Sequence, residues 1–80
     1  MTYYTYPVAG LGYLPDPDSV QDHDTLEDAY AAFVEDVRVT CEHTETDMPA
    51  DLPSLADARN AMPGGLAYGY GGWIHVIGQD

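Results

Sequence analysis

Five carboxylates in the first third of the chain have a spacing that is typical of metal-binding loops. Asp16, Asp18, Asp22, Asp24 and Glu27 occupy positions 1, 3, 7, 9 and 12 of a twelve-residue window. The calcium loop of an EF-hand uses these positions and position 5 for oxygen ligands, and position 6 for a glycine. Here Val20 stands at position 5 and Gln21 at position 6. We therefore interpret the segment as an acidic linker and expect no metal site.

The thiol and the imidazoles do not form a zinc-binding or nucleophilic pattern. Cys41 is the only cysteine, and the histidines are His23, His43 and His75. Structural zinc needs four Cys or His ligands at characteristic spacings, which this set does not supply. Cys41 and His43 are two residues apart, so they do not converge on one face of a helix. We expect neither an enzyme nor a cofactor.

The acidic residues, including four of the calcium-like window, predict a binding surface. Four of them fall within about 40° of one another on the wheel of a helix over about 25–42, opposite its apolar residues. These four are Asp24, Asp28, Glu35 and Glu42. Further carboxylates flank this segment in polar loops. The predicted partner-binding residues are Asp16, Asp18, Asp22, Asp24, Asp28, Glu35, Glu42, Glu45 and Asp47. The alternative is an ordinary solvated outer face.

The charge of the whole chain restricts its partners. Fourteen Asp and Glu residues face two arginines and no lysine, for a formal net charge of −12. Proteins bind nucleic acids and anionic membranes through Lys and Arg, so we exclude both as direct partners. A basic, nucleic-acid-binding protein is the expected partner. Like charges destabilise a compact chain, so either a binding role or a salty environment would compensate for this charge.

Two helices are predicted between the polar loops. An apolar stripe with steps of three and four residues predicts a helix over about 25–42, with Asp24 as its N-cap and Glu27 completing a capping box. The stripe consists of Leu26, Tyr30, Phe33, Val37 and Cys41. Pro53 suits the first turn of a shorter helix over 54–62, which Pro63 and two glycines end.

The two ends of the chain have the composition of β-strands. The aromatic first fourteen residues predict an edge strand that bends at Pro7. Residues 66–70 and 73–77 flank Gly71-Gly72, which predicts a hairpin in which Tyr70 faces Trp73 and Tyr68 faces His75. The predicted fold is a single acidic α+β domain spanning 1–80, with a small antiparallel sheet packed on two helices.

One face of the predicted hairpin is aromatic, and the other carries small residues. If the helices cover the small side, Tyr68, Tyr70 and Trp73 are exposed and form a protein interface or a homodimer seam. If the helices cover the aromatic side, the same residues belong to the core. The sequence leaves both arrangements open.

The chain resembles the small acidic proteins with which phages and mobile elements block host defence, including DNA mimics and acidic anti-CRISPR proteins. The resemblance concerns size, acidity and the absence of lysine, and it involves no matched motif. It implies an inhibitor that occupies a basic, nucleic-acid-binding surface of a partner protein. The alternative is an assembly protein that oligomerises through the aromatic hairpin, with acidity serving solubility or salt adaptation. A lone cysteine, no signal-peptide pattern and no apolar run near twenty residues predict a cytoplasmic protein.

Overall fold

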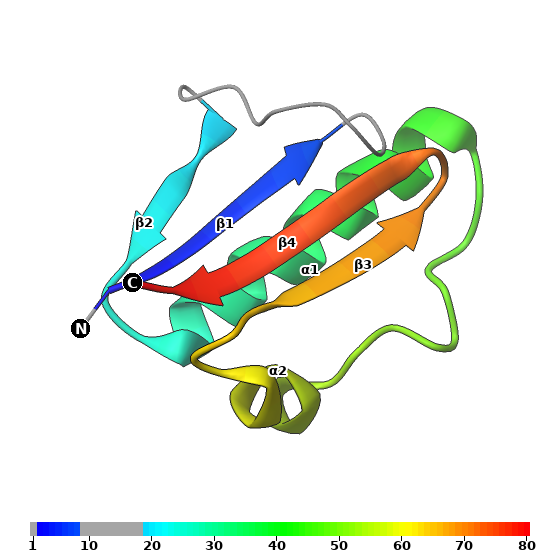
Figure 1. The fold of residues 1–80 in the computed structure, drawn as a ribbon. Helices are drawn as coiled ribbons and strands as arrows, with labels where there is room; N and C mark the ends of the chain where they lie inside the picture. Colours follow the sequence, from blue (N-terminus) through cyan, green and yellow to red (C-terminus); the bar gives the residue numbers. More distant parts are fainter. Residues whose placement is uncertain (1, 9–18) are drawn as a thin grey trace.

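The computed structural model describes residues 2–8 and 19–80 and has an α+β fold, as the sequence predicts. Four antiparallel strands form one sheet in the order β2-β1-β4-β3, and a long helix packs on one face of it (Figure 1). The elements are β1 (Tyr3–Val8), β2 (Gln21–His23), α1 (Leu26–Thr44), α2 (Leu55–Ala61), β3 (Leu66–Tyr70) and β4 (Trp73–Gln79).

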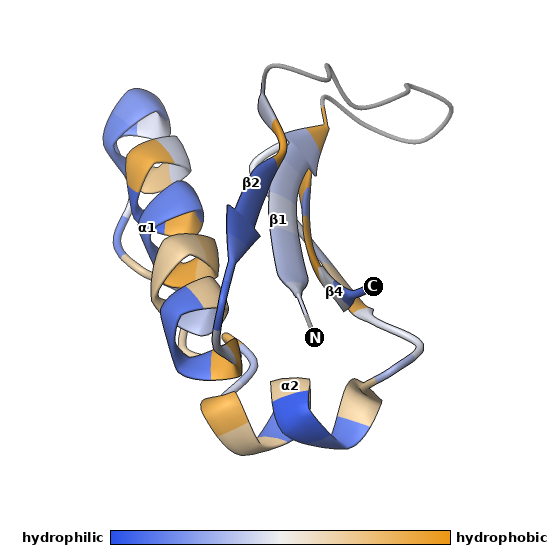
Figure 2. Ribbon diagram, turned by 90° about the vertical axis from the view of Figure 1, so that its left-hand side faces the viewer, coloured by the Kyte–Doolittle hydropathy of each residue, from blue (hydrophilic) through white to orange (hydrophobic). Residues whose placement is uncertain are grey.

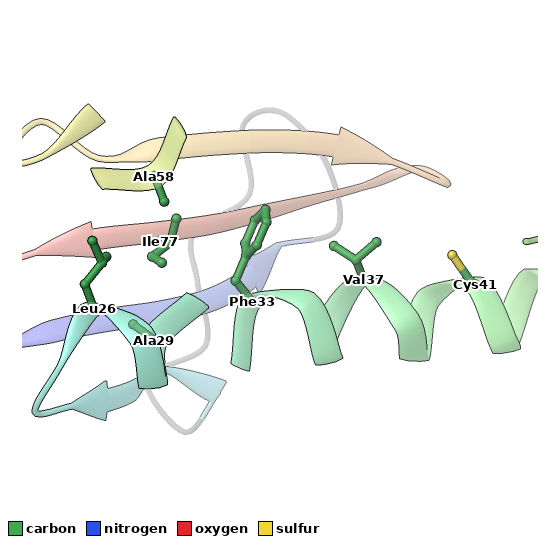
Figure 3. Packing of buried hydrophobic residues seen from close by; sticks show 7 residues of the cluster. All are labelled: Leu26, Ala29, Phe33, Val37, Cys41, Ala58 and Ile77. Atoms are coloured by element: carbon green, nitrogen blue, oxygen red, sulfur yellow. The ribbon is translucent and has the colours of Figure 1, made fainter. Parts of the chain in front are cut away.

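The predicted apolar stripe of α1 is confirmed as the centre of the core. Leu26, Phe33, Val37 and Cys41 are buried, together with Ala29 of the same helix. They contact Ile77 of β4 and Ala58 of α2, which are fully buried (Figure 3). A stripe of this width buries one side of α1 against the sheet and leaves the opposite side in solvent.

The N-cap of helix α1 lies one residue later than predicted. Thr25, not Asp24, is the N-cap, because its backbone is extended and its hydroxyl accepts a hydrogen bond from the Asp28 amide at 3.1 Å. At the other end, Glu45 adopts a left-handed backbone with φ 55°. The amides of Glu45 and Thr46 then bond back to the carbonyls of Glu42 and Cys41, which is the pattern of a Schellman motif.

The predicted hairpin is confirmed in its register. Tyr70 pairs with Trp73, Tyr68 with His75 and Leu66 with Ile77, although β4 continues two residues beyond the predicted end. Gly71 and Gly72 form the turn with φ of 62° and 84°, a conformation that favours glycine. The two-residue turn therefore fixes which side chains of β3 and β4 share a face.

The prediction that the first strand is an edge strand is wrong. β1 lies between β4 and β2, and β2 forms within the segment that was expected to be a loop. The sheet consequently has four strands, one more than expected. Pro7 is tolerated because β2 pairs only with Tyr3 to Thr5, so β1 has no second neighbour at Pro7 among the described residues.

Helix α2 is shorter than predicted and lies beyond one end of the sheet (Figure 2). Ser54 is its N-cap, and Asp57 completes a capping box with Ser54. Pro53 therefore precedes the cap and is not in the first turn. Its carbonyl accepts a hydrogen bond of 2.8 Å from the Tyr30 hydroxyl, which ties the approach to α2 to the side of α1.

The second face of the sheet is not covered by any described element (Figure 2). Tyr4 and Tyr6 stack there with ring centroids 5.9 Å apart. The ring of Tyr4 lies across Gly78, where an added Cβ would clash with the ring. By register, Ile74 and Val76 of β4 share this face with the tyrosines. An aromatic and aliphatic surface is therefore partly exposed to solvent.

Candidate functional site

The outward side of α1 carries the carboxylates that the sequence singled out. Of the nine predicted residues, Asp16 and Asp18 lie outside the described residues. The other seven are exposed: Asp22, Asp24, Asp28, Glu35, Glu42, Glu45 and Asp47. They fall into two kinds: those that form an ion pair with an arginine and those that do not.

Arg38 neutralises the middle of this surface. Its guanidinium forms ion pairs with Glu35 and with Glu42, one turn before and one turn after it on α1. The hydrogen bond with Arg38 lowers the pKa of Glu35, and the two carboxylates raise the pKa of Arg38. Fully exposed pairs of this kind contribute little to the stability of a helix, because solvent screens them. Their main consequence is that one of the two negative charges is offset within the chain, which leaves this part of α1 less charge for a partner.

Arg59 is also occupied. Its guanidinium lies 2.6 Å from the carboxylate of Glu27, which links α2 to the first turn of α1. The sequence patterns did not predict this pair. Ala58 of the same helix lies in the core, whereas Arg59 is exposed. Both arginines of the chain are therefore engaged with carboxylates of the same chain.

Of the seven described residues of the predicted set, the five without an ion pair lie near the two ends of α1. Asp22, Asp24 and Asp28 lie at its beginning, and Glu45 and Asp47 follow its last turn. A helix of 19 residues is about 28 Å long, so two acidic groups stand roughly that far apart. We name them the N-terminal acidic group (Asp22, Asp24, Asp28) and the C-terminal acidic group (Glu45, Asp47).

The C-terminal acidic group is electrostatically unfavourable. The carbonyl end of a helix has a partial negative charge, and carboxylates there are destabilising. Tyr70 donates a hydrogen bond of 3.1 Å to the backbone carbonyl of Asp47, and the Cys41 thiol points to the same oxygen at 3.6 Å. These contacts use the backbone, so the side chain of Asp47 remains available. The fold holds this acidic segment in place without neutralising it.

In the structure, α1 covers the aromatic side of the hairpin, which is one of the two arrangements that the sequence left open. Tyr68 and Tyr70 are partly buried and pack against the core, with the Tyr68 ring edge-on to Phe33 at 6.4 Å. Burial and a hydrogen bond to Asp51 raise the pKa of Tyr68 to about 12. Trp73, at the turn, remains 42% exposed. Of the three proposed interface residues, Trp73 alone is left largely open to a partner.

A half-buried carboxylate that the sequence analysis did not single out lies on the flank of α1. Asp36 borders a cavity of about 470 Å³ together with Val39 and Trp73. Burial raises the pKa of Asp36, the nearby charge of Glu35 raises it further, and His23 acts in the opposite direction. On a helical wheel Asp36 is about 60° from Phe33, closer to the core stripe than the other carboxylates. This small angle is the feature of the sequence from which the partial burial of Asp36 could have been predicted.

His75 is the other perturbed group beside this cavity. It is 1% exposed, and its Nε2 lies 3.2 Å from the Thr40 hydroxyl. Burial lowers the pKa of His75, because charging an imidazole away from water is costly. Its Nδ1 is buried and has no hydrogen-bond partner within the described ranges.

Within residues 2–8 and 19–80, no group of three or more His, Cys, Asp or Glu side chains could hold a metal ion. Asp16 and Asp18 of the calcium-like spacing lie outside those ranges. The described helices include none with the length and apolarity required to cross a bilayer. Comparison of the chain with protein-family models, with curated proteins and with solved structures found no match.

Proposed function

We propose that this chain is an acidic interaction protein that occupies a basic, nucleic-acid-binding surface of a partner protein, as DNA-mimic inhibitors of phages and mobile elements do. One observation carries the proposal. Both arginines are held in ion pairs within the chain, while the N-terminal and C-terminal acidic groups stay exposed and unpaired. The chain has a net charge of −12, and these five carboxylates contribute to it without an ion pair in the described part of the chain. The proposed role requires binding and no catalysis.

The distance between the two acidic groups indicates which arrangement of basic residues on a partner could bind them. Duplex DNA carries one charge per roughly 1.7 Å of axis, so a 28 Å helix spans about eight base pairs. The described part of the chain has too few unpaired carboxylates to copy every phosphate over that length. It instead fits a partner with two clusters of Lys or Arg about 28 Å apart. Complementary charge would accelerate encounter and set the orientation of the complex.

A double charge reversal tests this proposal. Asp28→Lys and Asp47→Lys change one residue of each acidic group, and neither carboxylate makes an ion pair or a hydrogen bond that the fold requires. The immobilised chain should retain basic proteins at about 0.05 M salt and release them at about 0.5 M. Each retained protein is then purified and its affinity measured by calorimetry. A purified partner that binds the reversed chain as tightly as the original would contradict the proposal.

Assembly through an aromatic surface is the second candidate, and we propose the uncovered face of the sheet for it in place of the hairpin. Tyr68 and Tyr70 pack on α1, whereas Tyr4 and Tyr6 stack on the uncovered face of the sheet. A second copy of the chain is the occupant that we consider, because copies with a charge of −12 repel except across a weakly charged face. Light scattering on the original chain and on Tyr6→Ser tests this candidate. Assembly predicts that the original chain is an oligomer and that the variant is a monomer. If both are monomers, assembly through this face is rejected.

A further inference from the structure

The cavity beside α1 combines exposed apolar side chains with a carboxylate. It opens between the C-terminal half of α1, the start of β4 and the end of β1, with a volume of about 470 Å³. Trp73 is 42% exposed and Val39 is 38% exposed, and both border it. Pro7 of β1 contributes a further apolar surface. The indole of the single tryptophan is thus open to whatever enters.

Neither arginine pairs with Asp36; the basic groups near it are the imidazoles of His23, which lowers its pKa, and of His43, which also borders the cavity. Arg38 is bound by Glu35 and Glu42, and Arg59 is bound by Glu27. The carboxylate is half-buried, and burial raises its pKa because the charged form has lost part of its hydration. His75 also borders the cavity, and burial lowers its pKa, which favours the neutral imidazole. A positive charge entering from outside would replace the lost hydration.

We propose that this cavity receives an arginine side chain of the basic partner. The guanidinium stacks on the indole of Trp73 and pairs with the carboxylate of Asp36. The methylene groups of the arginine lie against Val39 and Pro7. This inference rests on the proposed function, since it assumes a cationic partner, and it adds a specific contact to a surface that otherwise attracts charge without selecting side chains.

Arginine fits these features better than lysine does. A guanidinium is planar and weakly hydrated, stacks on aromatic rings and can donate two parallel hydrogen bonds to one carboxylate. Trp is the best aromatic partner for a cation. An ammonium group is compact and strongly hydrated, so entering a half-buried, largely apolar cavity costs it more. The cavity therefore discriminates between two residues of equal charge, which the exposed acidic groups do not.

Two peptides of equal length and charge, hexa-arginine and hexa-lysine, test the inference at about 0.05 M salt. Calorimetry gives the affinities, and fluorescence of Trp73, the only tryptophan, reports on the cavity itself. We expect the original chain to bind hexa-arginine about tenfold more tightly. Hexa-arginine should change the emission of Trp73, and hexa-lysine should leave it nearly unchanged.

Asp36→Asn keeps the shape of the side chain and removes its charge. The variant should lose the preference for hexa-arginine, and its melting temperature should rise, because a partly desolvated charge is gone. Asp28→Asn is the matched control: it removes one charge in the first turn of α1, away from the cavity, and it should weaken both peptides equally. A higher melting temperature in Asp36→Asn excludes unfolding as the cause of lost binding.

Two results overturn the inference in distinguishable ways. If both peptides bind equally and Asp36→Asn behaves like Asp28→Asn, the arginine cavity is wrong while the acidic interaction surface stands. If neither peptide binds the original chain at low salt, the proposed function fails and the cavity assignment fails with it.

Discussion

Replacing Glu45 by glycine should stabilise the fold by about 1 kcal/mol. Glu45 adopts the left-handed conformation, φ 55° and ψ 42°, which costs a residue with a Cβ about 1–2 kcal/mol. Glycine avoids this cost, but its freedom in the unfolded chain offsets about 0.4–1 kcal/mol. Removing a carboxylate from the negative end of α1 adds about 0.3–1 kcal/mol. The net gain is therefore about 1 kcal/mol.

The gain is large enough to measure by thermal unfolding. For 80 residues the unfolding entropy is about 0.17 kcal/mol per kelvin, so 1 kcal/mol raises the melting temperature by about 6 °C. Glu45→Ala is the control, because it removes the charge and retains the Cβ in the left-handed conformation. It should gain only the helix-end contribution, which salt screens. If Glu45→Gly is no more stable than Glu45→Ala, the backbone argument is refuted.

The remaining predictions concern salt and pH. Melting temperature should rise between about 0.02 M and 0.5 M sodium chloride, because the excess of like charges is screened; an unchanged or lower value contradicts self-repulsion. Burial lowers the pKa of His75 below 6.5, so the unfolded chain takes up the proton first, and stability present above pH 6.5 is lost as pH falls below it. The raised pKa of Asp36 contributes to the pH dependence of stability with the opposite sign. Comparison of the original chain with His75→Gln therefore isolates the contribution of His75. Chemical unfolding from pH 7.5 to 5 should give a flatter profile for this variant, and identical profiles would reject the assignment.

Local patterns predicted the parts of the fold that depend on them. The spacing of the apolar residues gave α1 its buried face, and the Gly-Gly pair determined the hairpin register because a two-residue turn allows few alternatives. β2 escaped prediction because Gln21 to His23 are polar. Its strand conformation comes from hydrogen bonding to β1, which leaves no apolar alternation to read. The N-cap differed because Asp24 and Thr25 are both good caps, and only the backbone distinguishes them.

The candidate site was predictable to the extent that it depends on exposure. The described carboxylates of the predicted set are exposed, as residues opposite an apolar stripe should be. Their division by Arg38 follows from spacings of three and four residues and could have been foreseen. The pairing of Glu27 with Arg59 spans 32 residues and depends on where α2 packs. Which side of the hairpin α1 covers likewise depends on tertiary packing and not on a local sequence pattern.

Displacement of duplex DNA from a purified partner is the most direct test of the proposed function. A fluorescent duplex bound to the partner is titrated with the original chain and with the Asp28→Lys, Asp47→Lys variant, and anisotropy reports the bound fraction. The account predicts that the original chain releases the duplex and that the reversed chain needs at least about tenfold more protein, mainly because it associates more slowly. Equal displacement by the two chains, or none by the original, would contradict the claim that the acidic surface takes the place of nucleic acid.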